Sequence, residues 1–174
     1  MPGWKEDPNC QDTPTRVAKM FINELQAGVF NMPPKITVFS NDHKYDGIIF
    51  EGNIDVKSMC SHHHMPFFGV AHVGYIPNPN GKYIGLSKLN RLVDYYARRA
   101  NVQEDLTMQI HNGIAKLIGD NLGIAVVISA KHTCVSHRGA KNESTMKTSK
   151  LSGLFFSNEI GTRAEFYHLI NGGM

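Results

Sequence analysis

The order of hydrophobic patterns along the 174-residue chain constrains its fold more than any other feature. Residues 36–58 are predicted to be extended, because apolar and polar side chains alternate over residues 54–58. Residues 67–76 are aromatic and β-branched, and Ile124–Ala130 is a near-continuous apolar run, so each predicts a strand.

Helical patterns precede and separate these strands. The first helix is predicted to begin with Thr13 as N-cap and Pro14 at the first helical position, to bury one face, and to end at Gly28. Its apolar face comprises Val17, Phe21 and Leu25. A second helix is predicted to be capped by Ser87, a third to span residues 103–118, and a short apolar segment to follow around 166–170. This order predicts an α+β fold with an antiparallel sheet rather than alternating βαβ units.

Composition supports one compact domain. The chain is 41% hydrophobic and 19% charged, which is ordinary for a globular protein. Residues 1–11 are predicted to form a loose tail, and residues 12–174 a single domain. We expect a cytoplasmic protein with no membrane partner, because no apolar run approaches ~20 residues and the first residues do not resemble a signal peptide. The net charge of +3 gives no reason to expect nucleic-acid binding.

Three residues form a candidate metal site. Cys60 and His63 lie three apart on a predicted connection between strands, and Cys134 follows a strand far along the chain. Zinc accepts thiolate and imidazole ligands, and three protein ligands leave a fourth position open for water, as in catalytic sites. Alternatives are a surface histidine patch or a structural zinc, although a structural site would require a fourth ligand and Cys10 lies in the predicted tail.

Five motifs, in order from about residue 12 to 170, resemble those of the GTP cyclohydrolase I family. Cys60-Ser61-His62-His63-His64-Met65-Pro66-Phe67-Phe68-Gly69 is similar to its Cys-Glu-His-His-x-x-Pro-Phe-x-Gly signature. The other four are Thr13-Pro14-Thr15-Arg16-Val17-Ala18-Lys19, Ile84-Gly85-Leu86-Ser87-Lys88-Leu89-Asn90-Arg91, Val102-Gln103-Glu104 with Leu106-Thr107, and His132-Thr133-Cys134 followed by Arg138-Gly139.

The resemblance implies metal, acid–base and substrate-binding residues. The implied zinc ligands are Cys60, His63 and Cys134. The implied proton-transfer residues are His62 and His132, with Ser87 at the ribose. Guanine would be recognised by Glu104, with the backbone of Gln103 nearby. The triphosphate would be held by Lys88, Arg91, Arg138, Arg16 and Lys19. For Arg16 and Lys19 the alternative is a solvated helix face, and for Glu104 it is a charge that complements the helix dipole.

The implied reaction opens the purine ring of GTP at C8, with His132 protonating N7, and releases formate. A rearrangement of the ribose, helped by Ser87 and His62, then gives dihydroneopterin triphosphate. Zn²⁺ is the only implied cofactor. The implied fold is the tunnelling fold, an antiparallel sheet with helices on one face. The implied assembly is a toroidal homodecamer with active sites between subunits.

Three positions depart from the family pattern. Ser61 replaces the usual Glu, which removes a charge from the connection that carries Cys60 and His63 (residues 60–66, the metal turn). We expect activity to survive this change. His64 is predicted to be exposed, and His137 to lie beside the phosphates. Since the chain begins close to the first motif, we expect no feedback-regulatory partner to act through an N-terminal extension.

Three rival interpretations remain open at this point. A nitrile reductase of the tunnelling fold would use a lone Cys nucleophile and NADPH, and the candidate ligands His63 and Cys134 argue against it. A catalytically silent relative would bind GTP without releasing formate. A zinc-stabilised interaction module would unfold on chelation.

Overall fold

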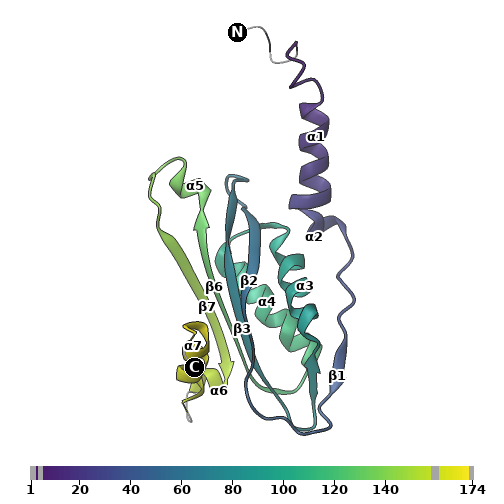
Figure 1. Cartoon of the computed structure of the whole chain (residues 1–174), viewed down its shortest axis with the longest axis vertical. Coiled ribbons are helices and arrows are strands. Elements are labelled where there is room, and N and C mark those ends of the chain that lie inside the picture. Colours follow the sequence, from purple (N-terminus) through teal and green to yellow (C-terminus); the bar gives the residue numbers. More distant parts are fainter. Residues whose placement is uncertain (1–2, 4–5, 158–160, 173–174) are drawn as a thin grey trace.

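The computed structural model describes residues 3, 6–157 and 161–172, and its centre is a five-stranded sheet (Figure 1). The strand order is β5-β2-β3-β6-β7. The strands are β2 (Ile49–Cys60), β3 (Pro66–Pro77), β5 (Ala100–Asn101), β6 (Asn121–His132) and β7 (Thr145–Gly153). All pairs are antiparallel except the short β2–β5 pair, which is parallel. The predicted α+β fold with an antiparallel sheet is therefore confirmed, with one short parallel strand added at an edge.

The strands form where the sequence pattern predicts them. Ile54, Val56 and Ser58 are buried while Asp55 and Lys57 are exposed, as the alternation requires. β6 extends the predicted segment by a few residues at each end. The extended region 36–58 divides into β2 and a three-residue strand, β1 (Val38–Ser40), which pairs with β4 (Lys82–Ile84). The connection between β3 and β4 is a turn, closed by a backbone hydrogen bond from the Gly81 amide to the Asn78 carbonyl.

Two helices, α3 (Leu86–Ala97) and α4 (Gln103–Ile118), cover one face of the sheet (Figure 1). Their apolar residues, including Leu89, Val93 and Ile110, join the inward-facing strand residues in the main hydrophobic core. The third predicted helix has the predicted bounds. The second begins two residues earlier than predicted: its N-cap is Gly85 rather than Ser87, and Ser87 lies within the first turn.

The opposite face carries a smaller core under two short C-terminal helices, α6 (Leu154–Ser157) and α7 (Thr162–Ile170). Phe155 and Phe166 are fully buried there and meet edge to face. The apolar segment predicted around 166–170 is the second half of α7. These helices add a partial layer to a sheet whose long helices lie on the other face.

The N-terminal segment is helical but interrupted. It comprises α1 (Thr13–Met20), a π-helical turn η1 (Phe21–Leu25) and α2 (Ala27–Phe30). The N-cap is Asp12 rather than Thr13. Every residue of α1 is exposed, including Val17 at 42%, so the predicted apolar face is not buried within this chain. In Figure 1, α1 extends beyond the end of the sheet.

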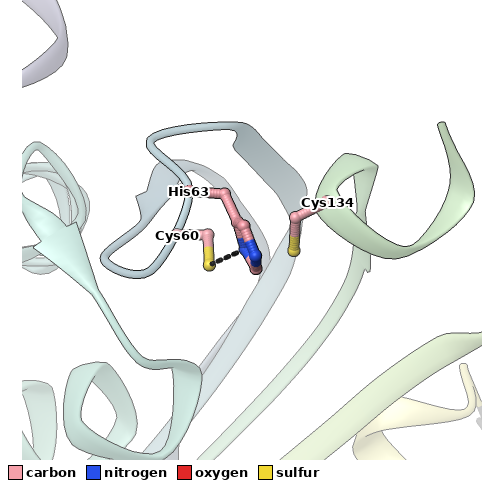
Figure 2. Close-up of side chains that lie close together, drawn as sticks. All are labelled: Cys60, His63 and Cys134. Carbon is pink, nitrogen blue, oxygen red and sulfur yellow. Dashed lines mark hydrogen bonds between the residues drawn. The ribbon is translucent and has the colours of Figure 1, made fainter. Parts of the chain in front are cut away.

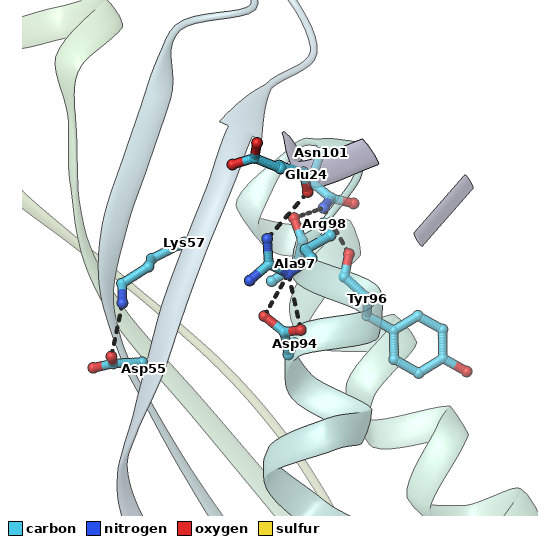
Figure 3. Close-up of polar contacts among 8 residues, drawn as sticks. All are labelled: Glu24, Asp55, Lys57, Asp94, Tyr96, Ala97, Arg98 and Asn101. Carbon is cyan, nitrogen blue, oxygen red and sulfur yellow. Dashed lines mark hydrogen bonds and ion pairs between the residues drawn. The ribbon is translucent and has the colours of Figure 1, made fainter. Parts of the chain in front are cut away.

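Gly28 was predicted to end the first helix, but it lies within α2. Its missing side chain allows α2 to approach α3 closely. A Cβ atom at this position would lie 2.1 Å from the backbone oxygen of Tyr95, and the Gly28 amide donates to the Arg98 carbonyl. Figure 3 shows the Arg98 guanidinium, which contacts Asp94 and donates to the Glu24 carbonyl in η1. The base of the N-terminal segment is thereby fixed to the C-terminal end of α3.

The predicted tail falls partly outside the described residues, since residues 1–2 and 4–5 are not described. Residues 6–12 form consecutive turns, with backbone hydrogen bonds from Cys10 to Asp7 and from Thr13 to Cys10. The division at residue 12 stays a prediction. Within the described part of the chain, we find no helix with the length and apolar character needed to cross a membrane.

Candidate metal centre and substrate site

The predicted metal ligands Cys60, His63 and Cys134 converge at one end of the sheet (Figure 2). Their ligand atoms all lie within 4.8 Å of one another, and Cys60 Sγ is 3.8 Å from His63 Nδ1. Tetrahedral zinc with bonds of roughly 2.0–2.3 Å separates its ligand atoms by about 3.5 Å, so a small contraction would close the group around an ion. Cys60 is buried and His63 is exposed, which leaves one side of the group open.

Backbone contacts hold these ligands in place. Cys60 ends β2, and its amide donates to the Met65 carbonyl, which closes the turn that carries His63. Cys134 lies on the short helix α5 (Thr133–Ser136), which follows β6 directly. The Thr133 hydroxyl donates to the Pro66 carbonyl at 2.6 Å, and this bond joins α5 to the start of β3.

Asn101 fastens the base of the metal turn to the end of α3. Its backbone pairs with Cys60 in the β2–β5 register, and its carbonyl accepts from the Ser61 amide. Its side-chain amide donates to Ser58 Oγ at 3.0 Å and to the Tyr96 carbonyl at 2.9 Å (Figure 3 shows the latter). The position of Cys60 therefore depends on a buried amide that the sequence motifs did not single out.

The donor set fits a thiophilic cation. Two thiols and an imidazole favour zinc over magnesium or calcium, which prefer oxygen ligands. Burial raises the pKa of the Cys134 thiol, and the neighbouring Cys60 raises it further. The Cys134 thiol therefore stays protonated near neutral pH unless a cation stabilises its thiolate.

The two predicted proton-transfer histidines lie beside this group. His62 Nδ1 is 3.7 Å from Cys60 Sγ, and its side chain is exposed. His132 ends β6, two residues before Cys134, and its ring stacks on the buried ring of Phe67 at 4.4 Å. Burial lowers the pKa of His132, and the negative charge of Glu104 partly opposes that shift.

The predicted guanine-binding residues begin α4 at the same end of the sheet. Glu104 is exposed in the first turn of this helix. The adjacent Gln103 was expected to offer only its backbone, but its side chain is 1% exposed and hydrogen-bonded to His132 Nε2 at 2.7 Å. The sequence did not predict this side-chain contact, although Gln103 was named because it lies next to Glu104 in the same motif.

Not all predicted phosphate-binding residues lie at this end. Arg138 follows α5, close enough to Cys134 to lower its pKa slightly. Ser87, Lys88 and Arg91 lie on the N-terminal half of α3, where Asn90 donates to Glu51 near the start of β2. Glu51 and Cys60 are about nine residues apart along that strand, or about 30 Å at ~3.3 Å per residue. Ser87 and Lys88, in the first turn of α3, therefore lie well away from the metal group of their own chain, whereas Arg91 is about 9 Å along the helix from Ala97 at 1.5 Å per residue.

Arg16 and Lys19 are exposed on α1, and Arg16 makes a surface ion pair with Asp12 at 3.6 Å. The next segment contacts the metal turn, because the ring of Phe21 stacks on that of His64. His64 is exposed, as predicted, and has a left-handed backbone conformation (φ 50°). His137 is also exposed and contacts Ser136 Oγ.

The sheet, its helices and the clustered donors are those of an α+β enzyme with a site for a metal ion. Comparison with known proteins defines the family. The model of the family described as GTP cyclohydrolase I matches residues 4–171. The chain therefore belongs to the GTP cyclohydrolase I family, a family of hydrolases.

Curated relatives agree with this assignment. GTP cyclohydrolase 1 of Flavobacterium johnsoniae is 46% identical over 166 residues, which cover 94% of this chain and 72% of the relative. The enzyme of the same name from Aeromonas salmonicida is 41% identical, with 95% and 75% covered. That of Corynebacterium glutamicum is 39% identical, with 96% and 86% covered.

Proposed function

We propose that this protein is a zinc-dependent GTP cyclohydrolase I, which hydrolyses GTP at C8, releases formate and yields 7,8-dihydroneopterin 3'-triphosphate. The observation that carries the proposal is the Cys60, His63 and Cys134 group beside His62 and His132, in a chain of this family. The donors favour zinc among the metals of comparable size. When bound in such an open three-ligand site, zinc lowers the pKa of water to near neutrality and so supplies a nucleophile.

The two histidines would move protons during the reaction. His132 is held on the face of Phe67 and would protonate N7 of the purine, which weakens the bonds of the imidazole ring. His62 is exposed next to Cys60 and would act later, with Ser87, in the rearrangement of the ribose. Burial makes the protonated His132 ring a stronger acid, so it gives up its proton readily once it has been protonated.

Glu104 would select guanine over adenine. A carboxylate can accept hydrogen bonds from both the N1–H and the 2-amino group of guanine, and adenine offers neither donor. A site discriminates strongly against a ligand that leaves one of the site's buried polar groups without a hydrogen-bond partner. The exposed position of Glu104 at the start of α4, on the side of His132, supports this role.

The triphosphate would be bound by residues of more than one subunit. Arg138 belongs to the same end of the sheet as the metal group, whereas Ser87, Lys88 and Arg91 would come from α3 of another copy. Arg16 and Lys19, on the exposed helix α1, would complete the set. Several cations are needed for a ligand with about four negative charges, and Arg provides forked contacts to phosphate.

The family implies an oligomer, and we propose the toroidal decamer with shared active sites expected from the resemblance. The exposed apolar residues of α1 and α2, among them Val17, Val29 and Phe30, suit burial against other subunits. The cytoplasmic location expected from the sequence stays a prediction. The product would serve pterin synthesis such as the folate pathway.

Turnover of GTP tests this function. Purified protein with bound zinc is incubated with GTP, and the product is followed by its absorbance and, after oxidation, by its fluorescence. We expect a steady rise in product. Bound GTP without product would support the silent relative, and NADPH oxidation with a nitrile substrate would support the reductase.

A further inference from the structure

The buried side chain of Gln103 makes a set of hydrogen bonds that fixes the direction of its amide. It is the first residue of α4, is 1% exposed, and lies over the seam between β6 and β7. Its Nε2 donates to the Ile128 carbonyl at 3.3 Å, to the Met146 carbonyl at 3.2 Å and to Thr148 Oγ1 at 3.1 Å. Its Oε1 faces His132 Nε2 at 2.7 Å.

The two backbone carbonyls determine which way the amide points. A carbonyl oxygen only accepts hydrogen bonds, so the NH₂ group of Gln103 must face Ile128 and Met146. The reverse orientation would place three carbonyl-type oxygens against one another, which is costly in a buried position. The oxygen of Gln103 is therefore the atom presented to His132.

This orientation determines the tautomer of His132. Because Gln103 Oε1 is an acceptor, His132 Nε2 must carry a hydrogen and donate it. The ring cannot easily turn away, since one face stacks on Phe67 with an interplanar angle of 11°. In the neutral imidazole only Nδ1 then has a free lone pair.

We propose that Gln103 is a positioning residue that holds His132 as the Nε2–H tautomer and makes Nδ1 the nitrogen that exchanges protons with the substrate. This inference rests on the proposed function and adds a role for a residue that had been expected to contribute only its backbone. The Nε2–H···Oε1 bond is present in both the neutral and the protonated imidazole.

An amide suits this role better than a carboxylate would. Gln103 is uncharged, so it orients the ring without adding a negative charge beside a histidine that must release its proton. It also donates to the strands while accepting from His132, which an ionised carboxylate cannot do. The Thr107 hydroxyl donates to the Gln103 carbonyl and contacts Thr148, which further restrains the first turn of α4.

Imidazole nitrogen NMR tests the tautomer without relying on activity. The full-length protein is labelled with ¹⁵N-histidine and studied metal-free and with zinc, and His132 is assigned by loss of its signals in His132→Asn. We expect one protonated Nε2 and one unprotonated Nδ1 in the wild type, in both states. In Gln103→Met, which has a similar shape but no oxygen, the two nitrogens should shift toward averaged values. A protonated Nδ1 in the wild type would overturn the proposal.

Two further variants separate positioning from a general structural effect. Gln109→Met is the matched control, because it makes the same change on α4 at a partly exposed site that contacts Arg99 instead. Gln103→Glu is the conservative variant, since its carboxyl group retains an oxygen for Nε2–H. We expect both to keep the wild-type tautomer of His132. Averaged signals in Gln109→Met, or unchanged signals in Gln103→Met, would contradict the inference. If Gln103→Met does not fold, averaged nitrogen signals of His132 in Gln103→Glu would contradict the inference instead.

Kinetics complete the test. We expect Gln103→Met to lower kcat for GTP about 10- to 100-fold, the range typical of residues that orient a reacting group, with little change in KM. An unchanged kcat together with a lost tautomer would refute the catalytic consequence. If the wild type keeps the expected tautomer but shows no turnover of GTP, the proposed function fails while the orientation of His132 stands.

Discussion

The thiol of Cys60 lies 3.8 Å from Nδ1 of His63, although the two residues are separated by a sharp turn at the end of β2. Cys134 reaches the same point from α5. The turn is closed by two backbone hydrogen bonds, from the Cys60 amide to the Met65 carbonyl and from the His64 amide to the Cys60 carbonyl. These hydrogen bonds hold Cys60 and His63 in position relative to each other.

Replacing Cys134 by Ser should abolish metal binding and leave the fold intact. Ser is a poor zinc ligand, whereas the two hydrophobic cores consist mostly of residues on the sheet and helices. Metal content and far-UV circular dichroism measure the two effects, and Cys10→Ser is the control. Full zinc occupancy in Cys134→Ser would show that the ligand set is wrong, and unfolding on chelation would favour a structural zinc.

Replacing Glu104 by Gln should weaken GTP binding by about 10- to 100-fold. The change removes charged hydrogen bonds worth about 1.5–3 kcal/mol. Binding is measured by calorimetry, with ATP as the competing nucleotide. Asp105→Asn is the matched control, because Asp105 is the neighbouring exposed carboxylate. Equal losses in both variants would mean that net charge, not guanine recognition, is responsible.

Mixed oligomers should regain activity that neither parent has. We proposed that α3 of another copy completes the site, so we expect Arg91→Ala and Cys134→Ser to damage the two halves of a shared site. When the two variants are coexpressed, some sites should combine an intact α3 from one copy with an intact metal group from another. Activity in the coexpressed sample, measured against each variant alone, tests this. Complete inactivity of confirmed mixed oligomers would contradict shared sites.

The stability of the fold should fall as the pH drops below about 6.5, partly because of His111. This side chain is buried between α4 and β7, where it contacts Ser152 Oγ at 2.8 Å. Burial lowers its pKa; the hydrogen bond to Asn112 opposes this shift, and the charge of Lys150 adds to it. The unfolded chain therefore binds the proton more tightly, so the stability present above pH 6.5 is lost as the pH falls through the folded pKa.

Urea unfolding at several pH values measures this effect. In His111→Gln, which keeps a polar group near Ser152, the decline below pH 6.5 should be shallower than in the wild type. His43→Gln is the control, because His43 is exposed. An identical pH profile in His111→Gln would show that His111 does not cause the loss of stability. Burial also lowers the pKa of His72, which contributes in the same direction.

The sequence was most informative where local patterns and packing agree. Residues 103–118 form the predicted helix because their apolar residues fall on one face that the sheet covers. Residues 54–58 alternate because one face of β2 is buried. The convergence of Cys60, His63 and Cys134 was likewise predicted, since thiols and an imidazole can bind one metal ion together.

Other features depend on long-range contacts that no local pattern reports. Gly28 resembled a helix C-terminus, but its role is the close approach to Tyr95. The amphipathic pattern of α1 predicted a buried face, but all residues of this helix are exposed in the single chain. Gln103 was expected to use its backbone, because only the three-dimensional packing of β6 and β7 shows where its side chain points.

The release of formate as a function of bound zinc is the most direct test of zinc-dependent GTP hydrolysis by this protein. Metal-free protein is reconstituted with increasing amounts of zinc, and the initial rate of formate release from GTP is compared with the zinc retained. We expect no formate without zinc, and a rate that rises in proportion to zinc occupancy until the Cys60, His63 and Cys134 site is filled. Formate release at full rate from metal-free protein, or its absence from fully loaded and folded protein, would contradict it.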